Sequence, residues 1–331
     1  MRSGIAAAGN WIIDRVKLID VYPEQDALAN ILEESSGNGG APYNVLKALA
    51  KIGFAGNLEA IGLVGTDPDG DSILADCHLL GIDTSCLKQT DLAPTSYTAV
   101  MSVKATGRRT FFHQRGANAL LGPLAFDFDR IRASHLHLGY LLLLDELDKP
   151  DPEYGTVAAE VLSRAKKHGL TTSIDVVSED SDRFRATVKP ALGHADIVFM
   201  NEFELSRTSG IALKDSHDLR LLQAGELLIQ GISGLLVVHT PERVFAFTQD
   251  GKRIEHGSIR LPAADIQGAV GAGDAFAAGF LAGFSDGFET SECLRFGVCV
   301  AASSLLATDC SSGIQPWKDC LELGERYGYY T

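Results

Sequence analysis

Residues 268–279 have the sequence Gly-Ala-Val-Gly-Ala-Gly-Asp-Ala-Phe-Ala-Ala-Gly. A glycine-rich turn is followed directly by Asp274, and the small residues around it predict a helix over 272–284. Glycines allow backbone N–H groups to converge at a helix N-terminus, where an anion is favoured. The same pattern also fits a helix with an acidic first turn that packs tightly through small residues. The segment alone therefore leaves an anion site and a structural cap as alternatives.

Two common phosphate-binding patterns do not fit this segment. A Walker A loop would continue with Gly-Lys-Ser or Gly-Lys-Thr, and neither follows here. A dinucleotide fingerprint would be followed by a ribose-binding acid about 20 residues later. The strand predicted over 5–8 leads to Gly9-Asn10-Trp11 and not to a glycine-rich turn. A dehydrogenase is therefore a weak alternative.

Strands and helices alternate along most of the chain. Strands are predicted over 5–8, 58–63, 135–138, 171–176, 197–200 and 235–239, and helices over 44–52, 71–80, 154–168, 219–230, 272–284 and 291–306. The glycines of 37–40 are interpreted as a break, and 244–248 with 253–259 as an antiparallel pair. This alternation predicts an α/β fold with a central, mostly parallel sheet flanked by helices. Ligands of such sheets bind beyond the carboxyl ends of the strands.

A hairpin interrupts this alternation. Residues 95–103 and 109–114 have strand patterns joined by a turn at 105–108, and residues 12–22 and 27–34 also have strand character. We therefore expect a separate small β-sheet, formed by about 12–34 and 95–115, within one α/β domain that spans 1–331.

Composition narrows the function classes. The 331 residues carry a net charge of −14, and the basic runs are no longer than a pair, which argues against nucleic-acid binding. No apolar stretch reaches the roughly 18 residues of a membrane span, and Asn10 and Asp14 interrupt the apolar start too early for a signal peptide.

The six cysteines form no C-x-x-C pair. Cys293, Cys299 and Cys310 are expected in the core, and a reducing cytoplasm fits this usage.

Three further motifs accompany the glycine-rich turn. They are Gly-Gly-Ala-Pro-Tyr-Asn at 39–44, Gly-Leu-Val-Gly-Thr-Asp-Pro-Asp-Gly at 62–70 and Asn-Glu-Phe-Glu at 201–204. In this order and spacing, over essentially the whole chain, the set resembles the ribokinase-like carbohydrate kinases, the PfkB family. The resemblance implies an ATP-dependent and Mg²⁺-dependent enzyme that transfers the γ-phosphate to a hydroxymethyl group of a small sugar or sugar derivative.

The resemblance also implies roles for individual residues. Asp274 matches the catalytic base that accepts the proton of the sugar hydroxyl. The backbone loop that holds the transferred phosphoryl group is matched by Gly271, Ala272 and Gly273. The sugar-binding positions are matched by Asp14, Gly40 and Asn44.

The nucleotide end has matches of its own. Asn201 and Glu204 match a pair that organises Mg²⁺, often through water, although a polar strand-to-helix cap is the alternative interpretation. Thr240 matches the start of a nucleotide loop, and Asp175 resembles an acid near the phosphates.

The chain departs from the family pattern in three places. The usual Asp-Thr-Thr before the glycine turn is replaced by Gly268, Ala269 and Val270, which carry no side-chain oxygen, so we expect weak or absent activation by potassium. The usual Thr-x-Gly appears as Thr240-Pro241-Glu242, which questions the geometry of the nucleotide loop. Leu46 stands where a small residue is usual.

The small sheet is expected to act as a lid that covers the sugar and excludes water. Phe111, Phe112, His113 and Arg115 are candidates to face the substrate. A nucleoside kinase is the first alternative and would need a slot for the base, with Trp11 or Phe112 as candidate lining. A non-catalytic sugar-binding protein of the same fold is the second. Open edges of the lid would also allow a homodimer.

Overall fold

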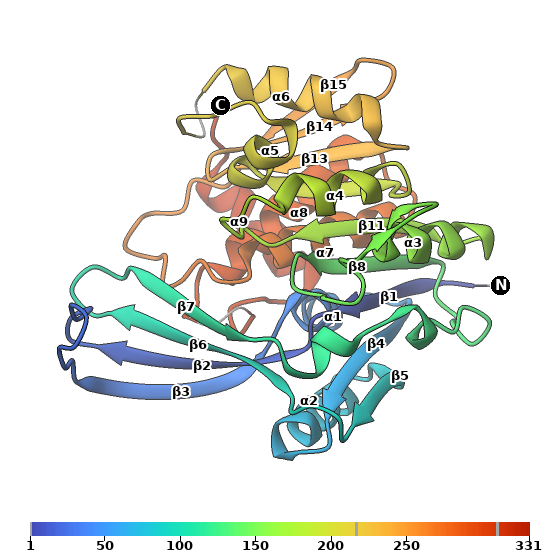
Figure 1. The fold of residues 1–331 in the computed structure, drawn as a ribbon. Helices are drawn as coiled ribbons and strands as arrows, with labels where there is room; N and C mark the ends of the chain where they lie inside the picture. Colours follow the sequence, from blue (N-terminus) through green and yellow to red (C-terminus); the bar gives the residue numbers. More distant parts are fainter. Residues whose placement is uncertain (1, 216–217, 309–310) are drawn as a thin grey trace.

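The computed structural model describes residues 2–215, 218–308 and 311–331. Its centre is a nine-stranded sheet in the order β15-β14-β13-β12-β11-β8-β1-β4-β5 (Figure 1). The strands are β1 (Gly4–Gly9), β4 (Asn57–Gly65), β5 (Asp83–Thr90), β8 (His135–Leu141), β11 (Thr171–Val176), β12 (Ile197–Asn201), β13 (Leu235–His239), β14 (Arg243–Thr248) and β15 (Arg253–Gly257). Neighbours from β5 to β13 pair in parallel, and β14 and β15 are antiparallel. The predicted α/β class is confirmed.

Helices cover both faces of this sheet because its buried strands are apolar on both sides. Ile5 and Ala7 lie in one core and Ala6 and Ala8 in the other. The first core also takes residues from α1 (Ala41–Ile52), α2 (Pro68–Leu79), α7 (Ala272–Ser285), α8 (Thr290–Ser304) and α9 (Trp317–Tyr327). The second takes residues from α3 (Val157–Lys167), α4 (Phe184–Leu192), α5 (Glu202–Ser209) and α6 (Arg220–Leu228). Short pieces complete the fold: β9 (Pro150–Asp151), β10 (Gly155–Thr156), η1 (Gly116–Leu120), η2 (Pro123–Ala125) and η3 (Ile229–Gly231).

A four-stranded small sheet projects to one side of the main sheet (Figure 1). Its order is β3 (Ile31–Gly39), β2 (Ile12–Ile19), β6 (Ser96–Val103) and β7 (Arg109–Gln114). β2 follows β1 after Asn10 and Trp11, so the small sheet begins at the carboxyl end of a central strand. Trp11 is fully buried there; its Nε1 donates to the carbonyl of Ile61 at 2.8 Å and its backbone N–H to Asn118 Oδ1 at 3.1 Å.

The glycines of 37–40 are not the break that we expected. β3 continues to Gly39, and α1 begins at Ala41 and not at Asn44. A Cβ on Gly39 would lie 2.2 Å from Asp14 Oδ2, and a Cβ on Gly40, at φ 92°, would lie 1.9 Å from the carbonyl of Asn10. These glycines therefore make room for neighbouring polar groups inside a continuous strand-to-helix connection.

Several elements gave little signal in the sequence. β5 is an edge strand with mostly polar residues, so it lacks the apolar run of a buried strand. α4 contains Pro190, which usually argues against a helix interior. The expected strand over 27–34 begins only at Ile31, and the expected 253–259 strand ends at Gly257.

The described cysteines are buried and free, and Cys293 and Cys299 lie in the core as predicted. Cys310 lies outside the described residues. Within the described ranges, no helix combines the length and the apolar character needed to cross a bilayer.

Candidate active site

Polar side chains gather where the parallel strands end. Asn10 directly follows β1, while Tyr140, Asp175, Asn201 and His239 lie at or next to the carboxyl ends of β8, β11, β12 and β13. These strands are neighbours in the sheet, and Gly9 pairs with Gly139 just as Asn201 pairs with His239. The sheet topology therefore places one row of polar groups along the edge where α/β proteins bind ligands.

The N-terminus of α7 stands over this row. Gly271 caps it in a left-handed conformation, at φ 73°, without a side-chain hydrogen bond to the helix. The first N–H groups of a helix have no acceptor within the helix, and the helix dipole makes this end positive. A Cβ on Gly273 would lie 3.4 Å from the His239 ring, so the turn packs against the end of β13. The predicted anion loop therefore forms a helix N-terminus, and its role in anion binding stays a prediction.

Asp274 lies in the first turn of α7 and is only 1% exposed. Asn44 Nδ2 donates to its Oδ2 at 2.8 Å, and the Tyr140 hydroxyl lies 2.7 Å from both carboxylate oxygens. Burial raises the pKa of Asp274 to about 6; these two hydrogen bonds lower it and the charge of Asp14 raises it. Residues that are far apart in sequence thus converge on one carboxylate.

Asp14 approaches Asp274 from β2. The missing side chain of Gly39 leaves the space that the Asp14 carboxylate occupies, and burial raises the pKa of Asp14 to about 6. Among the described residues, the buried atoms Asn44 Oδ1 and Asn10 Nδ2 have no hydrogen-bond partner. Because buried polar atoms are normally paired, an acceptor and a donor here fit the hydroxyl groups of a bound polyol.

One face of the small sheet carries a polar row toward this site. Asp14 is paired in register with Thr98, and Thr98 with His113. Cross-strand partners share a face of the sheet. Thr98 Oγ1 and His113 Nδ1 are 3.0 Å apart, and His113 Nε2 has no hydrogen-bond partner in the described part of the chain. His113 therefore lies on the same face of the small sheet as Asp14, which agrees with its prediction as a candidate to face the substrate.

The other predicted lid residues divide between two environments. Phe111 alternates with His113 and shares its face, whereas Phe112 points to the opposite face. Fully buried Trp11 and opposite-facing Phe112 are therefore wrong as the lining of a base slot. Arg115 donates to the carbonyl of Leu142 and to Asp145, both at 2.8 Å, so it anchors the base of the small sheet.

Asn201 and Glu204 form a capping box at the start of α5. Asn201 Oδ1 accepts from the backbone N–H of Glu204, and Glu204 Oε2 accepts from the backbone N–H of Asn201, both at 2.9 Å. Asn201 Nδ2 and Ser178 Oγ also donate to Glu204 Oε1, at 2.8 and 2.7 Å. The cap that we considered as an alternative is therefore present, while the role of the pair in Mg²⁺ binding stays a prediction.

Carboxylates concentrate along this edge. Burial raises the pKa of Asp175 well above its usual range, and the charges of Glu204 and Asp274 raise it further. Burial also raises the pKa of Glu204 to about 7. No group of three or more His, Cys, Asp or Glu side chains in the described ranges is placed to hold a metal directly. The residues present fit an ion held mainly by phosphates and water.

Thr240 closes a tight turn between β13 and β14. Its backbone N–H and its hydroxyl both donate to the carbonyl of Arg243, at 2.9 Å. Glu242, which replaces the usual glycine, is not among the described non-glycine residues with positive φ. The backbone of this turn therefore does not require a glycine, while the fit of the loop to a nucleotide stays a prediction.

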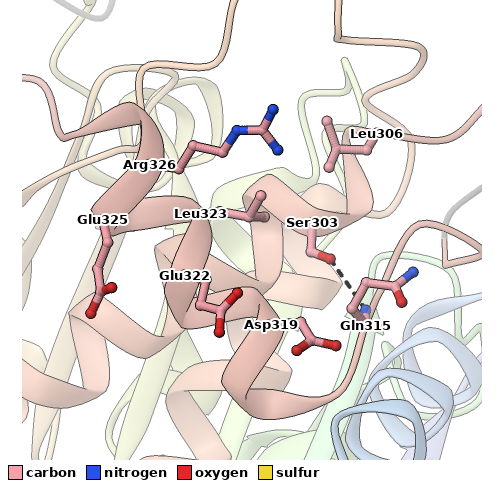
Figure 2. A pocket seen from close by; sticks show the side chains of 8 residues that line it. All are labelled: Ser303, Leu306, Gln315, Asp319, Glu322, Leu323, Glu325 and Arg326. Atoms are coloured by element: carbon pink, nitrogen blue, oxygen red, sulfur yellow. Dashed lines mark hydrogen bonds between the residues drawn. The ribbon is translucent and has the colours of Figure 1, made fainter.

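A surface pocket of about 540 Å³ lies elsewhere, between α8 and α9 (Figure 2). Its lining consists of Ser303, Leu306, Gln315, Asp319, Glu322, Leu323, Glu325 and Arg326. None of the candidate site residues belongs to this lining, and the pocket takes no part in the chemistry described above.

Sequence reasoning missed Tyr140, Asn10 and His239. Each lies at or next to the carboxyl end of a strand whose position the sequence did predict. The available signal was therefore the tendency of α/β sheets to bind ligands at the carboxyl ends of their strands. The contact of Tyr140 with Asp274 spans 134 positions of the chain. No local sequence pattern predicts a contact over such a separation.

A buried carboxylate in the first turn of a helix, with an unpaired buried donor and acceptor nearby, suits an enzyme that transfers an anionic group to an alcohol. The model of the pfkB family of carbohydrate kinases matches residues 7–318. The chain belongs to this family, and it is a phosphotransferase of the carbohydrate kinase class.

Curated relatives and solved structures agree with this assignment. The chain is 29% identical over 279 residues to an ATP-dependent ribose-1-phosphate kinase of Halopiger xanaduensis, covering 84% of this chain and 83% of that protein. It is 23% identical to a nucleoside kinase of Methanocaldococcus jannaschii, over 98% and 97% of the two chains. The structure of Arabidopsis thaliana ribokinase complexed with ribose and ATP superimposes with a TM-score of 0.80 at 23% identity, over 98% and 99% of the two chains. This likeness confirms the ribokinase-like fold.

Proposed function

We propose that this protein transfers the γ-phosphoryl group of ATP to a hydroxymethyl group of a small sugar or sugar derivative, with Asp274 as the general base. The convergence of Asn44, Tyr140 and Asp14 on the buried Asp274 carboxylate carries the proposal. A base must lie within hydrogen-bond reach of the hydroxyl that it deprotonates, and its pKa should lie near the working pH. A carboxylate with a pKa of about 6 meets the second condition, and an acceptor bound beside Asp14 and Asn44 would meet the first.

The acceptor would lie between the main sheet and the polar face of the small sheet. Asp14 accepts hydrogen bonds from sugar hydroxyls, while Asn44 Oδ1 and Asn10 Nδ2 offer one further acceptor and one further donor. Gly40 allows the close approach of this loop to Asn10. Thr98 and His113 extend the polar row away from the reacting end. Closure of the small sheet as a lid would exclude water from the reaction.

The transferred phosphoryl group would lie at the backbone N–H groups of Gly271, Ala272 and Gly273. These groups are aligned by α7 before the substrate arrives, so charge that develops on the phosphoryl oxygens is stabilised without reorganisation. Asp274 takes the proton of the attacking hydroxyl from the same helical turn. Positioning and charge stabilisation supply most of the catalysis in phosphoryl transfer.

Mg²⁺ would supply charge neutralisation at the phosphates. The carboxylates of Asp175 and Glu204 are buried, and the charge of Glu204 raises the pKa of Asp175, so a nearby cation would relieve the repulsion between them. Glu204 already accepts several hydrogen bonds, which favours contact through water. Asn201 holds Glu204 in place, and Thr240 shapes the turn that follows β13, near the nucleotide.

A nucleoside is the second candidate acceptor. Phe111 is 57% exposed on the face of the small sheet that carries Asp14 and His113, so its ring could cover a base. The deciding experiment is a phosphoryl-acceptor screen with ATP and Mg²⁺ over ribose, fructose, sugar phosphates, sugar acids, polyols, adenosine and inosine. Turnover of a free sugar or sugar derivative supports the first candidate, and turnover restricted to nucleosides supports the second.

A non-catalytic sugar-binding protein would show no turnover in this screen. Calorimetric titration with ATP, in the presence and absence of the sugars, separates that outcome from a missing acceptor. A catalytic member binds ATP even when its acceptor is absent from the screen, whereas a protein that has lost the nucleotide site does not.

The small sheet also supports a homodimer. β3 lies at its edge with a largely exposed surface, and Ile31 and Leu32 are 52% and 45% exposed. An exposed apolar edge strand favours pairing with another strand. Light scattering of the purified protein, repeated after Ile31→Lys, tests whether two copies associate through this edge.

A further inference from the structure

Tyr140 is held in front of Asp274 by the structure on both sides of it. Its backbone N–H donates to Oδ1 of the fully buried Asn10 at 2.9 Å. A Cβ on Gly139 would lie 2.8 Å from the Ala41 Cβ, so the glycine lets β8 pass close to the start of α1. The backbone on both sides of this strand end is therefore fixed independently of the Tyr140 side chain.

The segment after Tyr140 is fixed as well. Leu142 has a φ of 81°, which is rare for a leucine. Its carbonyl accepts hydrogen bonds from the guanidinium groups of both Arg115 and Arg183. Its N–H donates to Asp148 Oδ1 at 3.1 Å. The phenol hydroxyl is thus aimed by a rigid frame, and its contact with Asp274 is not an incidental surface bond.

The contact has an unusual form. The single hydroxyl of Tyr140 lies 2.7 Å from both oxygens of Asp274, so its proton is shared between them. Asn44 Nδ2 adds a donor to Oδ2 alone. These donors hold the plane of the carboxylate while lone pairs remain for an incoming hydroxyl. Donors to a carboxylate favour its ionised form, which opposes the effect of burial.

We propose that Tyr140 is a positioning residue, which orients the Asp274 carboxylate and keeps it ionised at neutral pH so that it can accept the proton of the acceptor hydroxyl. The inference rests on the proposed role of Asp274 as general base. Tyr140 acts through Asp274 and needs no contact with the substrate.

Other ionisable groups also face Asp274 and set the background for this effect. Asp14 approaches from β2 and Asp175 from β11, while His239 at the end of β13 packs against the adjacent Gly273. Burial is the largest cause that raises the pKa of Asp274, and the charge of Asp14 adds to it. Loss of the Tyr140 hydroxyl leaves these influences in place, so the pKa of Asp274 should rise.

The test compares Tyr140→Phe with the unchanged protein by a titration that needs no acceptor. Aspartate labelled with ¹³C at the carboxyl carbon is incorporated, and the Asp274 signal is assigned by its loss in Asp274→Asn. We expect the Asp274 midpoint to rise by about 1–2 pH units in Tyr140→Phe, the effect of one hydrogen bond to a charged group. The matched control is Tyr43→Phe, which removes a phenol that bonds to Asp76.

Kinetics with the best acceptor of the screen give the second readout. The acid limb of the kcat/KM profile should move upward by the same amount, so that kcat/KM at pH 7 falls about two- to tenfold and recovers at higher pH. An unchanged Asp274 midpoint overturns the proposal. A lower acceptor KM with a higher kcat/KM in Tyr140→Phe also overturns it, because the phenol would then compete with the substrate. Full turnover in Asp274→Asn would instead show that Asp274 is not the general base. Failure of the inference about Tyr140 is therefore distinguishable from failure of the proposed function.

Discussion

The proposed acceptor end and the proposed nucleotide end of the site are built in different ways. At the acceptor end, Asp274 is bonded to residues 230 and 134 positions away in the chain. At the nucleotide end, Asn201 bonds to Glu204 and Thr240 to Arg243, each only three positions away. The acceptor end therefore depends on tertiary structure, whereas the nucleotide end is held mainly by local caps and turns, with Ser178 as a more distant partner of Glu204. Substitutions should affect chemistry at the first end and local stability at the second.

The largest effect is expected at Asp274. Asp274→Asn removes the base while keeping the size of the side chain, and a general base contributes about 10²- to 10⁴-fold in rate. We expect turnover to fall by that factor while the affinities for ATP and acceptor persist. Steady-state kinetics and calorimetric titration measure the two parts. Near-normal turnover would show that the acceptor end does not carry the chemistry.

Asp14→Ala should separate binding from chemistry. Loss of a hydrogen bond to a charged group costs about 1.5–3 kcal/mol, so acceptor affinity should fall about 10- to 100-fold. ATP affinity should not change, because Asp14 lies on β2 at the opposite end. Glu34→Ala, which removes a carboxylate from the other side of the small sheet, is the control. Weakened ATP binding with intact acceptor binding would mean that the two ends are assigned in reverse.

Asp175 lies between the two ends, and its substitution tests their electrostatic connection. A carboxyl group whose pKa is raised on folding binds more protons in the folded state, so its contribution to stability is lost as pH rises through that pKa. Asp175→Asn should therefore raise the unfolding temperature at pH 7.5, and the difference should vanish near pH 4. Asp286→Asn, an exposed site on the C-terminal side of α7, is the control for net charge. An unfolding temperature lowered by Asp175→Asn at pH 7.5 would contradict this account.

Asn201 distinguishes a cap from a Mg²⁺ ligand. Asn201→Ala should cost about 1 kcal/mol of stability through loss of the N-cap. Asn201→Ser keeps a capping oxygen but removes the amide that bonds to Glu204. If the cap is the only role, the serine variant regains both stability and affinity for ATP with Mg²⁺. Recovery of stability alone, seen by thermal unfolding beside nucleotide titration, assigns Asn201 to the metal as well.

The smallest effect is expected from potassium. Gly268, Ala269 and Val270 offer no side-chain oxygen, and a Cβ on Gly268 would lie 2.9 Å from the carbonyls of Ala307 and Thr308. The loop is thus shaped for glycine, and exchange of potassium for a bulky organic cation at constant ionic strength should barely change the initial rate. A several-fold activation would show that backbone carbonyls alone make a cation site.

The same contrast explains how far the sequence could predict the structure. The central strands and α7 were predictable because apolar periodicity and turn glycines are local signals, and the ordered motifs placed Asp274, Asp14 and Asn44 at one site. Tyr140 was not predictable, because its partner is brought to it by the pairing of β8 with β1. Nor was the purpose of Gly39, whose missing side chain is explained only by the position of Asp14.

The anchoring of Trp11 limits how the small sheet could move in the proposed closure over the acceptor. Asn118 also returns a hydrogen bond to the Trp11 carbonyl at 3.0 Å, so the start of β2 is clamped on backbone and ring alike. Rotation of the whole small sheet as a rigid body about this junction would break the hydrogen bonds of Trp11. We therefore expect the sheet to bend along its length, with its distal end travelling and Asp14 staying in place. In such a molecule the acceptor would bind first to Asp14, which is already in place. Closure would then exclude water from a substrate that is already bound.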